Sequence, residues 1–139
     1  MKVIIANTDK EIQDAFTIRT RVFVDEQQVP EEEEIDKFES TSTHFVLYDH
    51  NTPVGAGRFR ILDGIGKVER ICVIKDYRGK GAGFHIMEAI HDYAKSKVQS
   101  LKLNAQTQAI PFYEKLGYTV DSEEFLDAGI PHKTMIKAL

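Results

Sequence analysis

The hydrophobic and polar positions of this chain follow two different periods, and each period predicts one kind of element. Short apolar or alternating runs predict strands over residues 2–6, 44–48, 53–61, 67–74, 100–105, 118–121 and 132–136. Apolar residues at helical spacing predict three helices: one from residue 9 to about residue 28, one that follows residue 83, and one over residues 110–116. The strands between residues 44 and 74 are separated by short turns, which indicates an antiparallel meander.

Residues at the predicted helix ends agree with these boundaries. Thr8 and Glu11 have the spacing of a capping box, in which each side chain accepts a backbone N–H at the start of the helix. Pro30 disfavours helical geometry just before it, so the first helix should end near Gln28. Gly117 stands just past the last helix, as glycine often does.

The segment over residues 31–42 departs from both periods. Glu31 to Glu34 are four consecutive glutamates, and Asp36 follows them. On composition this is a solvated, self-repelling loop with a helical turn at most. The functional alternative is that the clustered negative charge draws a cationic amine toward a neighbouring site.

Composition narrows the class of protein. With 139 residues, 42% of them hydrophobic, the chain is predicted to form one domain over residues 1–139. A net charge of −4 argues against nucleic acid or an anionic membrane as the main partner, and no apolar run is long enough to span a bilayer. The start of the chain lacks the features of a secretory signal. Cys72 is the single cysteine, and no Cys/His cluster has metal-ligand spacing, so we expect a cytoplasmic protein without a metal.

One turn carries candidate chemistry. Residues 78–83, Arg-Gly-Lys-Gly-Ala-Gly, lead from a predicted strand directly into a helix. Free N–H groups and the helix dipole make such a turn a site for phosphate, and glycine lets the ligand approach the backbone. The turn matches neither a P-loop nor a dinucleotide-binding motif. On the residues alone, a purely geometric role for these glycines remains an equal alternative.

Together with its surroundings, this turn resembles the GNAT superfamily of acyl-CoA-dependent N-acetyltransferases. Arg78, Gly81 and Gly83 match the pyrophosphate loop of that family, Arg/Gln-x-x-Gly-x-Gly/Ala, and residues 104–118, with their Phe-Tyr-x-x-x-Gly-Tyr segment, resemble its second CoA-side motif. The resemblance covers essentially the whole chain. It is closest to small bacterial members that also carry segments like residues 21–27 and 127–132.

The resemblance implies an α/β (α+β) fold with a mixed, mostly antiparallel sheet of six or seven strands, flanked by about four helices. Two central parallel strands, residues 67–74 and 100–105, would splay apart and hold pantetheine between them. The implied activity is direct transfer of an acetyl group from acetyl-CoA to an amine of a small molecule or protein, and the implied assembly is a homodimer. The residues implied to bind acetyl-CoA are Ile71, Cys72, Val73, Arg78, Gly79, Lys80, Gly81, Ala82, Gly83, Asn104, Phe112 and Tyr113. The alternative function is a CoA-binding sensor or interaction module without catalysis.

The resemblance also assigns the general acid. The family places a tyrosine at the position of Tyr113, near the CoA sulfur, where its hydroxyl can protonate the departing thiolate. Without the family context, packing of Tyr113 beside Phe112 in the core is the better interpretation.

The base and the acceptor side stay open. Regular pleating places Glu69 on the same face as Val73, toward the acceptor, which makes it a candidate base. Glu69 equally fits a cross-strand ion pair with Arg58 or Arg60. Glu26 is a second carboxylate that can reach the cleft, and a water relay to either is a further alternative. His132 is an acceptor-side candidate, although a structural hydrogen bond is its commoner role.

Cys72 raises the question of a covalent acyl-enzyme. Under regular alternation Cys72 faces away from Glu69, and no histidine adjoins it in sequence to activate the thiol. We therefore interpret it as a small buried apolar residue and favour direct transfer in a ternary complex.

Overall fold

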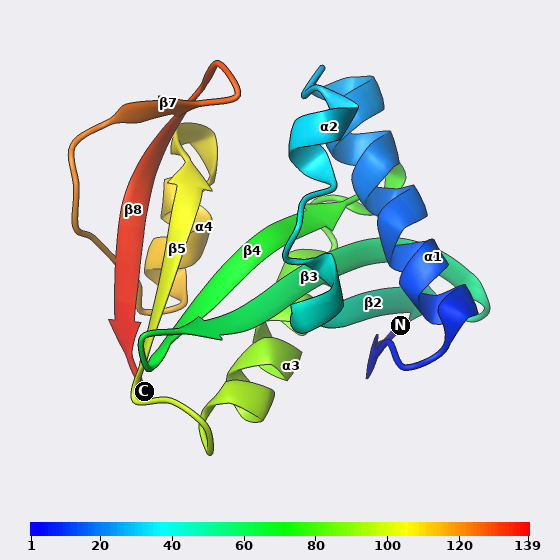
Figure 1. Cartoon of the computed structure of the whole chain (residues 1–139), viewed down its shortest axis with the longest axis horizontal. Coiled ribbons are helices and arrows are strands. Elements are labelled where there is room, and N and C mark those ends of the chain that lie inside the picture. The colour runs from blue at the N-terminus through cyan, green and yellow to red at the C-terminus, as the bar shows by residue number, and fades with distance from the viewer.

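A mixed eight-stranded sheet forms the centre of the computed structural model, which describes residues 1–139 (Figure 1). Its strands lie in the order β1-β2-β3-β4-β5-β8-β6, and β7 pairs with β8. All neighbours are antiparallel except β4 and β5, so the fold class predicted from the sequence is confirmed. The strands are β1 (Lys2–Ile5), β2 (Thr43–Asp49), β3 (Thr52–Leu62), β4 (Ile65–Val73), β5 (Ser100–Gln106), β6 (Thr119–Val120), β7 (Phe125–Asp127) and β8 (Ile130–Ala138).

Helices cover both faces of this sheet. Figure 1 shows α1 and α2 in front of β2, β3 and β4, and α3 behind them. The α-helices are α1 (Asp9–Arg19), α2 (Glu31–Glu34), α3 (Ala82–Ala94) and α4 (Ile110–Lys115). Shorter or differently wound turns are η1 (Thr20–Glu26), η2 (Glu39–Thr41), η3 (Lys75–Tyr77) and η4 (Thr107–Ala109). No helix is both long and apolar enough to cross a membrane.

The first predicted helix starts as expected and then changes its winding. The capping box is present, since Thr8 Oγ1 accepts the Glu11 N–H at 3.2 Å and the Glu11 carboxylate accepts the Thr8 N–H at 3.2 Å. After Arg19 the chain continues as the π-helical turn η1, which ends at Glu26, close to the predicted end. Such wide turns are frequent at functional sites, and this one ends beside the cleft described below.

The core fills the space between α3 and the sheet. Ile86, Met87 and Ile90 repeat at helical spacing along α3 and are fully buried. They pack in one continuous cluster with the apolar side chains of β2 and β3, such as Phe45 and Phe59. This packing fixes the start of α3 against the end of β4.

The two parallel strands separate after a short common stretch. Residues 66–68 of β4 pair with residues 101–103 of β5, and no pairing continues beyond them. Figure 1 shows β4 and β5 diverging from this point toward the top of the view. The predicted splay is therefore present, and it leaves β4 without a strand partner on its β5 side after Val68.

A β-bulge interrupts β4 just past the splay. Ala56 pairs with Cys72, whereas Arg58 pairs with Glu69, so Gly57 alone faces two residues of β4. Arg70 takes up the extra length with a φ of 59°, in the left-handed region. The regular pleating assumed for β4 is therefore wrong beyond Glu69.

The C-terminal hairpin contains a strand that the hydrophobic pattern does not predict. β7 pairs with the start of β8 through a tight turn in which Ala128 and Gly129 have φ values of 52° and 76°. Leu126 and Asp127 point to opposite faces of β7 and are both exposed, so the strand has no alternation of apolar and polar residues that would predict it.

Candidate active site

A cavity of about 680 Å³ opens where β4 and β5 separate. Its walls come from the end of η1, the second half of β4, the glycine-rich turn, β5, α4 and the β7–β8 hairpin. It therefore joins segments from nearly the whole chain. Of the residues predicted to bind acetyl-CoA, those that line it are Ile71, Cys72, Val73, Arg78, Gly79, Gly81, Ala82, Gly83, Asn104, Phe112 and Tyr113.

The glycine-rich turn has the geometry of an anion site. Gly81 is the N-terminal cap of α3 with a φ of 82°, and no side chain caps the first-turn N–H groups. A Cβ on Gly81 would meet no atom within 4 Å, so backbone conformation rather than space requires glycine there. A Cβ on Gly83 would lie 3.2 Å from the Phe112 ring, so Gly83 lets α4 approach α3 closely. Free N–H groups at a helix start fit the pyrophosphate of CoA.

The two basic residues of the turn already contact other groups of the protein. The Arg78 guanidinium donates two hydrogen bonds to the Glu26 carboxylate, at 2.6 and 2.7 Å, and Arg78 Nε donates to the Val73 carbonyl at 2.9 Å. The hydrogen bonds from Arg78 lower the pKa of Glu26. Glu26 does not line the cavity, and Lys80 lies over the Tyr77 ring at 5.7 Å.

Tyr113 sits on α4 at the inner wall of the cavity. Its ring packs edge-on against the rings of Phe112 and Tyr118, with centroid distances of 5.0 and 5.8 Å. Tyr113 also lines the cavity, so the packing role and the position in the cleft are compatible. The Tyr113 hydroxyl makes no hydrogen bond within the protein, yet it is not sealed from the cavity. Burial raises the pKa of this hydroxyl, which keeps it protonated at neutral pH.

Glu69 lines the cavity from β4 and forms the ion pairs that were its alternative assignment. One carboxylate oxygen accepts from Arg58 at 3.0 Å and from Arg60 at 2.8 Å, and the other accepts from Arg60 at 3.3 Å. Burial by itself would raise the pKa of Glu69, but the two arginines outweigh it, so the pKa is lowered. A carboxylate held in this way accepts a proton less readily than a free one.

The bulge also changes the place of Cys72. Because Glu69 and Arg70 both face the α1–α2 side, the next residue, Ile71, turns to the α3 side, where it approaches Gly57. Alternation then returns Cys72 to the side of Glu69, contrary to the expectation from regular pleating. Burial raises the pKa of the Cys72 thiol to about 12, which makes it a protonated, unreactive group at neutral pH.

His132 faces the cavity from β8. Its Nδ1 donates to the Ile130 carbonyl at 2.6 Å, and its ring stacks on Phe125 at 5.9 Å. The bond at Nδ1 fixes the tautomer, so the neutral ring carries its lone pair on Nε2. His132 thus has the structural hydrogen bond and, on its other nitrogen, a free acceptor.

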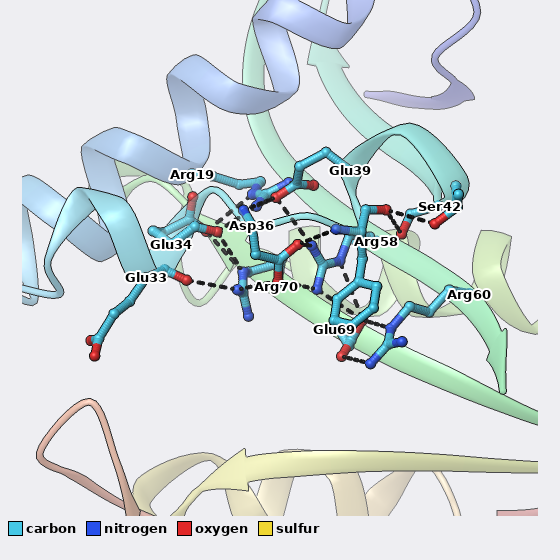
Figure 2. Close-up of polar contacts among 12 residues, drawn as sticks. Arg19, Glu33, Glu34, Asp36, Glu39, Ser42, Arg58, Arg60, Glu69 and Arg70 are labelled. Atoms are coloured by element: carbon cyan, nitrogen blue, oxygen red, sulfur yellow. Dashed lines mark hydrogen bonds and ion pairs between the residues drawn. The ribbon is translucent and has the colours of Figure 1, made fainter.

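The acidic segment is not a self-repelling loop. Glu34 is buried and pairs with Arg19 at 3.1 Å and with Arg70 at 3.0 Å, while Asp36 pairs with Arg58 at 2.8 Å. Figure 2 shows these contacts as one connected network under α1 and η2. The network contains four arginines and four carboxylates: Arg19, Arg58, Arg60 and Arg70, with Glu34, Asp36, Glu39 and Glu69. The helical turn allowed for this segment is present as α2, and the expected exposure to solvent holds only for Glu31 to Glu33.

Comparison with known proteins identifies the family. Residues 5–139 match the acetyltransferase (GNAT) domain. The uncharacterized N-acetyltransferase YjcF of Bacillus subtilis is 56% identical over 139 residues, which cover 99% of each chain. This chain belongs to the GNAT family of acetyltransferases.

Solved structures show the same fold. A protein from Lactobacillus plantarum with a known crystal structure is 27% identical in sequence. Its structure superposes with a TM-score of 0.92 over 99% of this chain and 97% of that one. A GNAT family acetyltransferase from Elizabethkingia anophelis, solved with acetyl-CoA bound, gives a TM-score of 0.77 at 13% identity, over 99% and 97% of the two chains. As a GNAT family member, this chain is an acyltransferase.

Sequence reasoning missed two features of the GNAT cleft. Gln27 and Gln106 pair their side-chain amides across it, with bonds of 2.8 and 3.4 Å, although they lie 79 positions apart. Arg70 and Lys67 also line the cavity. Gln27 and Gln106 lie in segments that carry the family resemblance, but the resemblance assigns them no role. The bulge that turns Arg70 to the cleft and the splay that opens the wall of β4 are properties of the folded sheet.

Proposed function

We propose that this chain transfers an acetyl group from acetyl-CoA to an amine, by direct attack of the amine on the thioester in a ternary complex. The observation that carries the proposal is the position of Tyr113, which lines a cleft between separated parallel strands and whose hydroxyl makes no hydrogen bond within the protein. The acetyl-CoA found in the Elizabethkingia anophelis relative supports the same donor for this chain.

The cleft supplies donors and acceptors of the kind that acetyl-CoA requires. Beyond Val68, the backbone of β4 has no strand partner on its β5 side. Apart from the Val73 carbonyl, which Arg78 holds, this leaves backbone groups near Cys72 and Val73 for the pantetheine amides and for polarising the thioester carbonyl. The N–H groups after Gly81 suit the pyrophosphate. Because Glu26 holds the Arg78 guanidinium, we assign the pyrophosphate mainly to backbone donors.

The chemical step exchanges one bond for another. The neutral amine nitrogen forms a bond to the acetyl carbon, the carbon–sulfur bond breaks, and the departing sulfur takes the proton of Tyr113. The nitrogen then loses its remaining extra proton to water, and water returns a proton to the Tyr113 oxygen. Cys72 plays no covalent part, since its thiol remains protonated.

The amine must lose a proton before it attacks. We assign this step to a water molecule next to Glu69 rather than to direct contact, because Arg58 and Arg60 occupy most of its carboxylate. On the opposite wall, the Nε2 atom of His132 accepts a hydrogen bond from the acceptor amine. Glu26 acts only through Arg78, as a residue that positions the turn.

A pair of glycine variants tests donor binding. Gly81→Glu places a carboxylate at the helix start and should abolish acetyl-CoA binding measured by calorimetry. Gly64→Glu is the matched control, because Gly64 has a φ of 77°, also has open space around it, and lies in the β3–β4 turn outside the cavity. Equal affinities in the two variants, or no binding by the native chain at millimolar acetyl-CoA, would refute the proposed donor. Binding that is lost only in Gly81→Glu justifies a screen of amines for release of free CoA.

A further inference from the structure

Arg70 reaches the cleft only because the sheet is irregular there. Its backbone has a φ of 59°, a conformation that residues other than glycine rarely adopt. In a regular strand, Glu69 and its successor would point to opposite faces. The bulge turns both side chains to the α1–α2 side, so strained backbone places a guanidinium in the wall of the cavity.

The Arg70 guanidinium is held firmly on two of its three nitrogens. Nε donates to the Glu34 carbonyl at 3.2 Å and lies 3.0 Å from the Glu34 carboxylate, while Nη2 donates to the Glu33 carbonyl at 3.3 Å and to Asp36 at 3.2 Å. Nη1 makes no hydrogen bond and is not sealed from solvent. Figure 2 shows one nitrogen of Arg70 without a dashed line. A planar fork fixed on one side, with a free donor on the other, is preorganised to bind an oxygen anion.

The carboxylates on the buried side of the cleft are already paired. Glu34, Asp36 and Glu69 are each already compensated by arginine. Lys67, which also lines the cavity from β4, has no carboxylate partner, and burial lowers its pKa. The half-buried wall of β4 therefore presents two basic donors with unused bonding capacity, although burial disfavours the charged form of Lys67.

Two exposed carboxylates oppose the binding of an anion in the cavity. Glu33 and Asp127 line the cavity without an ion pair, and both residues are exposed. Water and salt screen charges at such positions, whereas partly buried donors act at short range with less screening. The buried side of the cleft should therefore decide which group of the acceptor binds there.

We propose that Arg70, with Lys67 on the same strand, binds a carboxylate of the acceptor, so that the acceptor is an amino carboxylate rather than a simple amine or a diamine. This deepens the proposed function and rests on it for the identity of the amine as the reacting group. A singly charged carboxylate suits the site better than a phosphate dianion, because Glu34 and Asp36 already compensate most of the Arg70 charge. The network thus orients the Arg70 guanidinium and limits the negative charge of the ligand that it can bind.

Matched ligand pairs test the subsite without any chemistry. Unbranched ω-amino carboxylates and alkylamines of equal length are titrated by calorimetry into the free protein and into the protein saturated with CoA. We expect the amino carboxylate of at least one pair to bind about 10- to 100-fold more tightly, as for one charge-assisted hydrogen bond. Arg70→Gln should abolish this advantage, and Arg70→Lys should restore part of it. Arg21→Gln, an exposed arginine outside both the network and the cavity, is the control for the loss of one positive charge.

Several outcomes overturn the subsite. These are equal binding of the two members of every pair, tighter binding of a diamine, an advantage that survives Arg70→Gln, and no binding of any ligand at millimolar concentration. Acetyl-CoA affinity, measured in the same samples, reports on the fold of each variant. Because the titrations need no acetyl transfer, failure of the subsite and failure of the transferase are seen in different measurements.

Discussion

Glu26 and Arg78 form a two-bond ion pair, at 2.6 and 2.7 Å, that joins the end of η1 to the start of the glycine-rich turn. The two residues lie 52 positions apart, and each side chain is about 40% exposed. Since Arg78 Nε also donates to the Val73 carbonyl, one side chain connects η1, the turn and the end of β4. Through this connection Glu26 holds the start of the glycine-rich turn in place.

Glu26→Gln should therefore affect binding more than chemistry. The exposed pair contributes at most about 1 kcal/mol, so we expect KM for acetyl-CoA to rise by up to about fivefold with kcat nearly unchanged. Steady-state kinetics at low and high salt measure this, and salt should shrink the difference between native and variant. A drop in kcat of a hundredfold or more, with KM unchanged, would instead make Glu26 the catalytic base.

Tyr113→Phe should remove most of the activity and leave the fold intact. The hydroxyl makes no hydrogen bond in the protein, so its loss costs little stability, whereas the loss of a general acid lowers kcat by about 100- to 10,000-fold. Release of CoA thiol from acetyl-CoA, with acetyl-CoA affinity measured in parallel, gives both quantities.

A neighbouring tyrosine serves as the matched control. The Tyr118 hydroxyl lies 2.8 Å from His91 Nε2 and does not line the cavity. Tyr118→Phe should lower the free energy of unfolding by about 1 kcal/mol and leave kcat within a few fold of native. If the two variants lose activity equally, Tyr113 is a packing residue and another group protonates the sulfur.

The sequence predicts most of the fold because its signals there are local. The capping box at Thr8, the apolar repeat from Ile86 to Ile90 and the glycine-rich turn each act within a few residues. The parallel pair of β4 and β5 came from the family resemblance, since strand pairing leaves no mark on either strand alone.

The sequence does not predict which side chains at the end of β4 share a face of the sheet. A bulge shifts the alternation by one residue, and neither Glu69 nor Arg70 is of a type that signals one. The ion-pair network was missed for a related reason. Glu34 and Arg19 are 15 positions apart, and composition cannot distinguish a buried, paired glutamate from its exposed neighbours.

Cys72→Ala should keep kcat within about twofold of native. The thiol is buried and has a pKa raised to about 12, so too little thiolate exists at neutral pH to attack a thioester. Loss of the buried sulfur should cost about 1 kcal/mol of stability. Mass spectrometry of the native chain after incubation with acetyl-CoA should find no acetyl group on Cys72. An acetylated Cys72 that disappears on addition of an amine would establish a covalent route.

The ion-pair network should make the protein sensitive to acid. Burial of Glu39 opposes its ionisation, but the hydrogen bonds and charge of Arg19, with Arg58, lower its pKa from 4.5 to about 2. Because the folded-state pKa is the lower one, Glu39 contributes its full stabilisation above about pH 4.5, and this is lost as the pH falls toward 2. The contribution is on the order of 3 kcal/mol. The pKa values of Asp36 and Glu69 are lowered as well, so they act in the same direction.

Denaturant unfolding between pH 7 and pH 2 measures this effect. Glu39→Gln should be less stable than the native chain at pH 7, and its free energy of unfolding should fall less steeply below pH 4.5. Glu32→Gln removes an exposed glutamate of α2 that has no ion pair, so it should reproduce the native pH dependence. Equal slopes for the two variants would show that Arg19 does not hold Glu39 in its ionised form.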